Sequence, residues 1–435
     1  MTGKMKSAPV EIESATEKDG WKPEDLKMFK FLREVLNHID IAYVATYPPQ
    51  ECGIATFTRD LATAISKYTP FSDPMVVAVG EEAHIYPPNV IYQIRKSDLQ
   101  SYFDAAALLN DSHACAISVQ HEYGIFGGDD GQYVLDFIEK LKKPVIATLH
   151  TVLFKPSPNQ KRIVQRLGEL SKALVVMVKM GRDMLTDVYG IDPNKIAVIP
   201  HGVPNVHRVS PKVVKASLGI TDRPVISSFG LINRGKGIEY AIRAMPSILK
   251  ENPDAIYLVL GETHPGVRNY EGESYRQELL KLVEDLDLED HVRFNNRYLT
   301  LKELINYLCA TDVYVTPYIN RDQIVSGTLA YALGCGKAIV STPYLYAEEV
   351  LSEGRGLLVD FRKPEEMAQC VNNILGNQAL RERMEARAYR YGRRAAWFNV
   401  AIDYLDLLHK VCPKTAVVDE QPDYTDTHTS RRPKS

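Results

Sequence analysis

The feature that most constrains the fold of this chain is an alternation of short apolar runs with amphipathic helical patterns, which stops once and then starts again. Unbroken apolar strands that alternate with helices indicate a parallel sheet covered by helices on both faces. Before the interruption, strands are predicted at 41–46, 75–79, 90–94, 116–119, 145–149, 174–177 and 196–199. After it, they are predicted at 225–229, 256–260, 292–294, 313–316, 338–341 and 357–359.

The interruption predicts two doubly wound α/β domains, each Rossmann-like, in tandem. Prolines at 200, 204 and 211 break the alternation. In doubly wound sheets ligands bind at the carboxyl ends of the strands, so we expect the site in a cleft where the domains face each other. The expected parts are a leader with a short helix (1–38, helix at 24–37), a first domain (39–204), a linker (205–222), a second domain (223–396), a terminal helix (397–412) and a flexible tail (413–435).

Composition excludes several classes of protein. Hydrophobic residues make up 45% and charged residues 25%, as in ordinary globular domains. The formal charge of −3 gives no general electrostatic reason to bind nucleic acid or anionic lipid. The six cysteines lack metal-binding spacing and predict reduced thiols. Because the apolar runs are strand-sized and residues 1–20 lack a signal-like stretch, we expect no transmembrane segment and a cytoplasmic protein. The sequence does not indicate the oligomeric state.

A glycine-rich loop follows the predicted strand at 225–229. It contains Gly230, Arg234 and Lys236, and a helical pattern comes directly after it. Glycines let a backbone approach a ligand, while a lysine and a helix N-terminus favour a phosphate. An ordinary glycine-rich turn with solvated charges explains the same residues. The loop is neither a Walker A motif nor a GxGxxG fingerprint.

A second anion site is predicted at Ser326, Gly327 and Thr328. Ser326 is a natural helix N-cap, so the next amides and two hydroxyls face the same point. A plain capped helix is the alternative. Two such loops in one domain favour a diphosphate ligand. From the first domain, Gly53 of the turn after residues 41–46 is a third candidate, with a simple turn as the alternative.

Three histidines end predicted strands: His121, His150 and His201. A lone histidine is more often structural, but three at the ligand edge of one sheet favour a site, with His150 the strongest candidate. No compelling DxD, HExxH or GxSxG motif is present. Metal-dependent and serine-nucleophile chemistry therefore find no support in the motifs.

Taken together, these motifs resemble family 4 of the retaining, nucleotide-sugar-dependent glycosyltransferases, whose fold is GT-B. The resemblance extends over residues 39–411. Its motifs are YPPQECGIAT (47–56), IPHGV (199–203), the GRLxxxKG-like loop at 230–237, the AMACGKPVV-like segment at 332–340, and Trp397 with the helix that returns to the first domain.

The resemblance implies transfer of a sugar from a nucleotide-diphosphate sugar to a glycan or other hydroxyl acceptor. The donor is a co-substrate, and neither a cofactor nor a metal is expected. The leaving phosphate takes the acceptor proton. The implied residues are catalytic His150, Lys236 and Gln323; diphosphate-binding Gly53, Arg234, Lys236, Ser326, Gly327 and Thr328; nucleoside-binding Glu262, Asn296, Tyr298 and Tyr331; and acceptor-side His121 and Glu122.

The chain departs from the family pattern at the centre of the site. Leu231 replaces the arginine next to the loop glycine, and Arg234 is a possible substitute for it. The family's E-x7-E pair becomes Gln323 and Tyr331, which offer hydrogen bonds without negative charge. Two alternatives stay open. One is a catalytically impaired GT-B protein that binds a nucleotide or glycan, and the other is a different GT-B enzyme, a phosphorylase or an epimerase.

Overall fold

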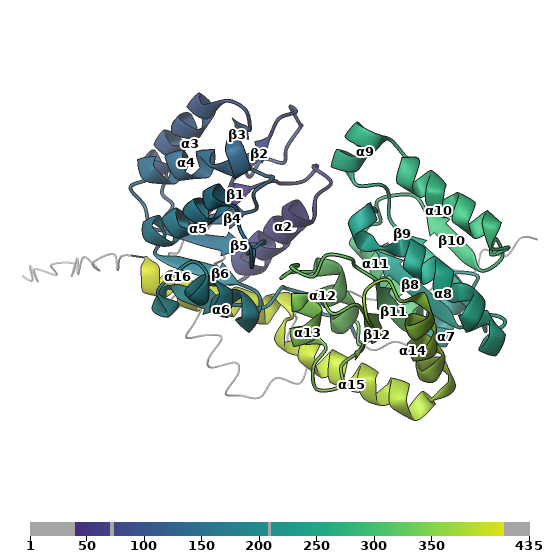
Figure 1. Ribbon diagram of the computed structural model, residues 1–435. Helices are drawn as coiled ribbons and strands as arrows, with labels where there is room; N and C mark the ends of the chain where they lie inside the picture. The colour runs from purple at the N-terminus through teal and green to yellow at the C-terminus, as the bar shows by residue number, and fades with distance from the viewer. Residues whose placement is uncertain (1–39, 70–73, 208–209, 413–435) are drawn as a thin grey trace, which may run out of the picture.

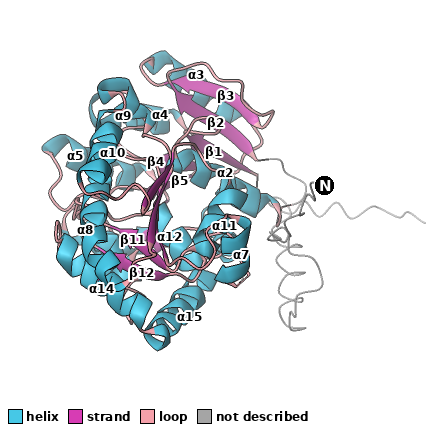
Figure 2. Ribbon diagram, turned by 90° about the vertical axis from the view of Figure 1, so that its right-hand side faces the viewer, coloured by secondary structure: helices cyan, strands magenta, loops and turns pink. Residues whose placement is uncertain are grey.

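The computed structural model describes residues 40–69, 74–207 and 210–412. The expected leader, the helix at 24–37 and the tail at 413–435 lie outside these ranges. The described chain forms two halves, coloured purple to blue and green to yellow in Figure 1. In each half, helices enclose a parallel sheet, as the magenta strands and cyan helices of Figure 2 show.

The first half is built on a seven-stranded sheet with the order β3-β2-β1-β4-β5-β6-β7. The strands are β1 Ile41–Ala45, β2 Met75–Gly80, β3 Val90–Arg95, β4 Ala116–His121, β5 Val145–Leu149, β6 Ala173–Val176 and β7 Ile196–Val198. The helices are α2 Gly53–Ser66, α3 Leu99–Asp111, α4 Tyr133–Lys140, α5 Pro158–Leu170 and α6 Lys179–Asp187, with short 3-10 turns at Asp129–Gly131 and Pro193–Lys195.

The second half is built on a six-stranded sheet with the order β10-β9-β8-β11-β12-β13. The strands are β8 Val225–Phe229, β9 Ile256–Leu260, β10 Val292–Asn295, β11 Val313–Thr316, β12 Ala338–Ser341 and β13 Leu357–Leu358. The helices are α7 Pro211–Ser217, α8 Ile238–Glu251, α9 Pro265–Glu271, α10 Ser274–Asp285, α11 Leu301–Ala310, α12 Gly327–Gly334, α13 Leu345–Val350, α14 Pro364–Gly376 and α15 Gln378–Arg394, with a 3-10 turn at Arg234–Lys236.

The predicted fold class is confirmed, and every predicted strand is present to within two residues at each end. The local reason is that the central strands are mostly apolar and are buried on both faces: all five residues of β1, β5 and β9 are buried. A strand buried on both faces needs helices on both sides, and each crossover supplies one.

Two segments cross between the halves side by side. Val203 forms a parallel bridge with Ala396, and Trp397, directly after it, begins α16 (Trp397–Val411). α16 runs back along the first half, in yellow in Figure 1, and packs against α2. The Tyr404 hydroxyl lies 2.9 Å from Thr148 Oγ1, so the chain's last described helix completes the core of the first half.

The segment expected to be a linker contains a helix. α7 packs against α11 of the second half. Lys215 of α7 is buried and forms an ion pair with Asp312. The second half therefore includes part of the segment that breaks the sequence pattern.

No helix among the described residues is long and apolar enough to cross a bilayer.

Candidate active site

Lys236 is the centre of a compact polar group at the carboxyl end of β8. Its Nζ donates to the Tyr318 hydroxyl at 2.7 Å, and that hydroxyl lies 2.6 Å from Thr328 Oγ1. Ser326 Oγ is 3.1 Å from the same threonine oxygen. The loops after β8 and β11 and the start of α12 therefore bring one ammonium and three hydroxyls together.

The start of α12 adds backbone donors to this group. Ser326 is the N-cap, as predicted, and its hydroxyl accepts from the Leu329 amide at 3.3 Å. Gly327 and Thr328 are the first two helical residues, whose amides have no acceptor within a helix. Amides at a helix N-terminus favour an anion.

The electrostatics of the group are positive. Burial by itself raises the pKa of Tyr318, but Lys236, Thr328 and Ser326 outweigh burial and hold it below its usual value. A phenol whose pKa falls in this way reports a local field that stabilises negative charge. The group is suited to a phosphate.

Two glycines let the loops meet here. Gly230 has φ of +133°, and a Cβ at this residue would lie 3.1 Å from the Thr328 methyl. Gly261 follows β9 with φ of +127°, and a Cβ there would lie 2.2 Å from the Gly230 carbonyl oxygen. Side chains would strain the backbone and push the strand ends apart.

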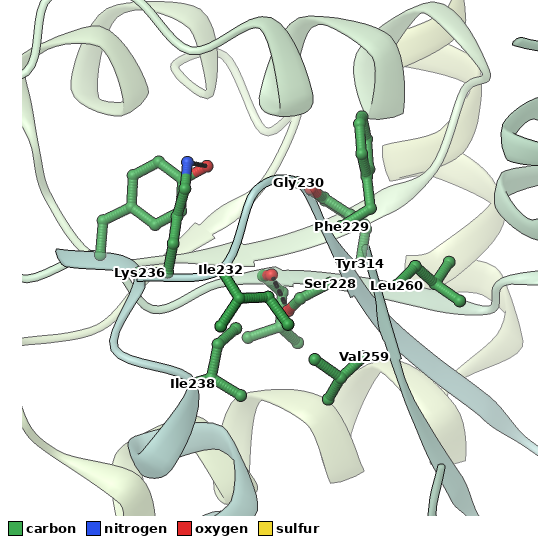
Figure 3. A pocket seen from close by; sticks show the side chains of 11 residues that line it. Ser228, Phe229, Gly230, Ile232, Lys236, Ile238, Val259, Leu260 and Tyr314 are labelled. Atoms are coloured by element: carbon green, nitrogen blue, oxygen red, sulfur yellow. Dashed lines mark hydrogen bonds between the residues drawn. The ribbon is translucent and has the colours of Figure 1, made fainter. Parts of the chain in front are cut away.

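A small, mostly apolar pocket lies beneath this loop (Figure 3). Lys236 borders it on one side and Phe229 on the other, with Gly230 between them. Phe229 stacks on Tyr331 with ring centroids 6.2 Å apart. The polar group around Lys236 therefore has an aromatic wall beside it.

Arg234, which was expected to support the diphosphate site, is paired with carboxylates in this structure and does not contact Lys236. Its guanidinium makes two hydrogen bonds to Glu278, at 2.7 and 2.8 Å, and contacts Glu271 at 3.3 Å. It also lies over the Tyr275 ring. Two carboxylates on α9 and α10 hold this cation, so the loop presents one lysine and not a lysine–arginine pair.

His150 lies at the end of β5. Its Nε2 is 2.9 Å from Gln120 Oε1, so the proton of the neutral ring is on Nε2 and Nδ1 is an acceptor. Burial, then the neighbours His201 and His121, lower the pKa of His150 to about 3. At neutral pH the ring is uncharged and is suited to hydrogen bonding.

Around His150 the two halves share an aromatic cluster. Phe57 contacts His150, His201 and Trp397 edge-on, with centroids 5.0, 5.1 and 5.3 Å apart. A Cβ at Gly327 would lie 3.0 Å from His201 Nε2, so the first half meets the start of α12 directly. Two of the three histidines thus lie in one cluster beside the anion site.

His121 and Glu122, predicted on the acceptor side, lie at the end of β4. His121 is fully buried, both ring nitrogens have no hydrogen-bond partner, and burial lowers its pKa to about 4. Glu122 accepts from Thr151, and its pKa is raised by burial. His121 is therefore an interior residue behind Glu122.

The predicted nucleoside residues are engaged by the first half. The Tyr331 hydroxyl donates to Asp60 at 3.1 Å, and the Tyr298 hydroxyl is 3.0 Å from Thr56 Oγ1. Glu262 influences Glu51 of the first half, whose pKa it raises, and its Oε2 accepts from an Arg268 nitrogen at 3.4 Å.

Thr56 and Asp60 therefore hydrogen-bond two of the four predicted nucleoside residues. The fourth, Asn296, is exposed. Asp60 itself is held by Arg59 at 2.7 Å.

Gln323 and Gly53 complete the predicted set. Gln323 is half-buried, and its Nε2 donates to the Val325 carbonyl at 2.8 Å, just before Ser326. Gly53 is the exposed first residue of α2, with open space around its Cα. Its amide belongs to the free N-terminal turn of that helix.

Tyr318 is the site residue that sequence reasoning missed. It comes two residues after β11, so the strand-end rule that selected the histidines applies to it as well. Gln120, the partner of His150, was also missed; it lies within β4, directly before His121.

Among the residues that the structure describes, no group of three or more histidine, cysteine or acidic side chains has the arrangement of a metal site.

The fold and the anion-binding loops define a two-domain protein of GT-B architecture. Two family profiles match it: Glycosyltransferase Family 4 over residues 53–205 and Glycosyl transferases group 1 over residues 212–391. The chain therefore belongs to the family 4 glycosyltransferases of GT-B fold, as the sequence motifs indicated.

Two relatives in sequence carry the names of glycosyltransferases. The chain is 29% identical over 264 residues to D-inositol 3-phosphate glycosyltransferase of Kineococcus radiotolerans, covering 57% of this chain and 59% of that protein. The match thus spans less than two thirds of that relative. A GDP-mannose-dependent phosphatidylinositol monomannoside mannosyltransferase of Corynebacterium glutamicum is 23% identical to this chain. The match covers 81% of this chain and 92% of that protein.

Solved structures share the fold at low identity. Anabaena HepE in complex with UDP and glucose has a TM-score of 0.68 and 14% identity, covering 85% of this chain and 99% of that one. WaaG, a glycosyltransferase involved in lipopolysaccharide biosynthesis, has a TM-score of 0.62 and 15% identity, with 85% and 99% coverage.

Proposed function

We propose that this protein transfers a sugar from a nucleotide-diphosphate sugar to a hydroxyl acceptor, with retention of anomeric configuration and without a metal ion. The observation that carries the proposal is the group of Lys236, Tyr318, Ser326 and Thr328 at the start of α12. The family membership of the chain and the UDP bound to HepE support it.

In the proposed reaction, the bond between the sugar's anomeric carbon and the diphosphate oxygen breaks. The acceptor oxygen bonds to that carbon on the same face, and its proton passes to the departing phosphate oxygen. The protein needs no base for this step, but it must stabilise charge on the leaving diphosphate. Lys236 and the amides of Gly327 and Thr328 supply that stabilisation, which is usually the largest catalytic contribution.

His150 is assigned to the sugar and not to proton transfer. Its depressed pKa keeps it neutral at physiological pH, so it cannot act as an acid there. The hydrogen bond to Gln120 fixes its tautomer and orientation. Gln323 is assigned to a hydroxyl of the donor sugar, because it precedes the diphosphate-binding turn.

The identity of the donor follows from binding. GDP-mannose and UDP-glucose are the first donors to test. One relative is named as GDP-mannose-dependent, and the similar structure of HepE was also solved in complex with UDP-glucose. A donor that binds the native state raises the melting temperature, by an amount that grows with the logarithm of its concentration. A thermal-shift screen compares nucleotide-diphosphate sugars with free sugars. The donor is the nucleotide-diphosphate sugar that raises the melting temperature when the free sugar does not.

Lys236→Ala tests the site. We expect turnover to fall by about a hundredfold, because one charge contact to the developing diphosphate anion is lost, while folding is kept. Lys250→Ala is the matched control, since Lys250 is an exposed lysine in the last turn of α8, the helix that follows the loop of Lys236. Steady-state kinetics on the donor found by the screen measure both variants. Normal turnover in Lys236→Ala rules out the proposed role of this lysine.

Metal independence has its own test. Turnover in excess EDTA is expected to equal turnover with added magnesium, because Lys236 and backbone amides supply the positive charge that a metal would otherwise supply. Loss of activity in EDTA, restored by magnesium or manganese, contradicts this part of the proposal and leaves glycosyl transfer itself intact.

Retention is read directly from the product. Proton NMR of the first product formed gives the anomeric coupling constant. The same configuration in donor and product supports the proposal, and the opposite configuration contradicts it.

A further inference from the structure

Two cysteines that are far apart in the sequence face each other at the end of α16. Cys115 lies just before β4, and Cys412 directly follows α16. Their sulfur atoms are 2.9 Å apart, although 297 positions separate them in the chain. A disulfide bond is about 2.05 Å long, so the sulfurs need to approach by less than about 1 Å.

The surroundings of this pair suit thiol chemistry. Both side chains are partly exposed, whereas Cys309 and Cys335 are buried. The hydrogen bond from Cys412 lowers the pKa of the Cys115 thiol, which favours the Cys115 thiolate as the attacking group. Reactive cysteines are those that are exposed to solvent and whose thiolate is stabilised.

Both backbones are anchored before any bond forms. The Cys115 amide donates to the Asp40 carbonyl at 2.8 Å, and the Cys412 amide donates to the Leu408 carbonyl at 2.8 Å. On α16, Leu408 and Tyr404 are buried in the core of the first half. The pair therefore meets because of packing, and a bond between the sulfurs would preserve that packing.

We propose that Cys115 and Cys412 form a reversible disulfide that fastens the last helix to the first domain. With a small-molecule disulfide as oxidant, the Cys115 thiolate attacks one of its sulfurs and releases one thiolate. The Cys412 thiolate then attacks the sulfur of Cys115 and releases the second. The protein loses two protons and two electrons, and the oxidant is reduced to two thiols.

The consequence is a redox-dependent gain in stability. α16 crosses from the second half and packs on α2, so its detachment would expose the core that it covers. A cross-link between distant positions removes much freedom from the unfolded chain and stabilises the folded one. We expect the oxidised protein to melt several degrees higher than the reduced protein.

The test treats the purified full chain with oxidised glutathione and, separately, with dithiothreitol. After oxidation we expect a mass loss of about 2 Da, a cross-linked peptide that contains Cys115 and Cys412, and a higher melting temperature. Dithiothreitol should reverse all three. Cys115→Ser and Cys412→Ser should each abolish the mass loss, and Cys370→Ser, a half-buried cysteine elsewhere, should not.

Three results overturn the proposal: an unmodified chain, stable glutathione adducts without a cross-link, or a cross-link through other cysteines. The peptide map uses the unaltered protein, so it decides the question even if a serine variant fails to fold. An oxidised chain that melts no higher than the reduced one overturns the stabilising role.

Discussion

At the scale of single residues, the loop after β8 shows how partner choice decides what a cation can do. Lys236 donates to a hydroxyl, which leaves its charge available to an anion. Arg234, two residues earlier, is paired with Glu278 and Glu271, which neutralise it. The same short loop thus presents one cation that no carboxylate among the described residues neutralises and one cation that two carboxylates neutralise.

Gln323 is the residue whose replacement separates two interpretations of the site. Its amide donates to the Val325 carbonyl, a bond that a carboxylate cannot make. We expect Gln323→Glu to lower turnover, because the new charge would face a carbonyl near the diphosphate site. Gln323→Ala should weaken transfer by about 1–3 kcal/mol if a donor hydroxyl loses its partner. Kinetics of both variants on the best donor provide the comparison.

A gain in turnover for Gln323→Glu would reverse this interpretation. It would mean that loss of the family's carboxylate has impaired the site, and that the protein binds nucleotide or glycan more than it turns them over. Gln323→Met is a size-matched control that removes hydrogen bonding without adding charge.

At the scale of elements, side chains that the sequence identifies start the helices. Thr300 and Glu303 form a capping box at the start of α11. Ser157 and Gln160 form another at α5, with Ser157 Oγ accepting from the Gln160 amide at 3.1 Å. These bonds are local, so short sequence motifs are enough to specify them.

Ser157→Ala should destabilise the protein by about 1 kcal/mol, since the cap of α5 is lost and its first amides lack an acceptor. Ser157→Thr, which keeps the hydroxyl, should unfold close to wild type. Urea unfolding should show a lower midpoint for the alanine variant with an unchanged slope. Equal midpoints for alanine and serine would show that the cap contributes nothing.

At the scale of the whole molecule, the first half closes on the second through the segment 51–60. Thr56 meets Tyr298 and Asp60 meets Tyr331. Glu51 of the same segment has a carboxyl whose pKa responds to Glu262 of the second half. The hydrogen bond to Glu262, then burial and the charge of Glu262, raise the pKa of Glu51, while Arg268 opposes the rise.

Closure should therefore depend on pH. Because the pKa of Glu51 is higher in the closed form, its contribution to closure is present at low pH and is lost as pH rises through that pKa. The radius of gyration from small-angle scattering should increase as pH rises through the raised pKa of Glu51. Glu51→Gln should suppress the increase, and Glu82→Gln, an exposed control, should leave it unchanged. If Glu51→Gln shows the same pH dependence as the wild type, a group other than Glu51 causes it.

What the sequence determined by itself is what short-range physics controls. Apolar runs of strand length between helical patterns specified two parallel sheets, because a strand buried on both faces must be apolar throughout. Ser326 marked the start of a helix, since a cap bonds within three residues. The glycines and Lys236 marked the anion-binding loops by the same local logic.

What only the tertiary structure decided is which partner each long side chain takes. Arg234 meets Glu278, Tyr331 meets Asp60, and Cys115 meets Cys412, pairs that lie 44, 271 and 297 positions apart. No local pattern encodes such pairs, because they depend on how helices pack and how the two halves close. Partner choice leaves Lys236 free for a phosphate and holds Arg234 in an ion pair, so packing determined which of the two cations belongs to the site.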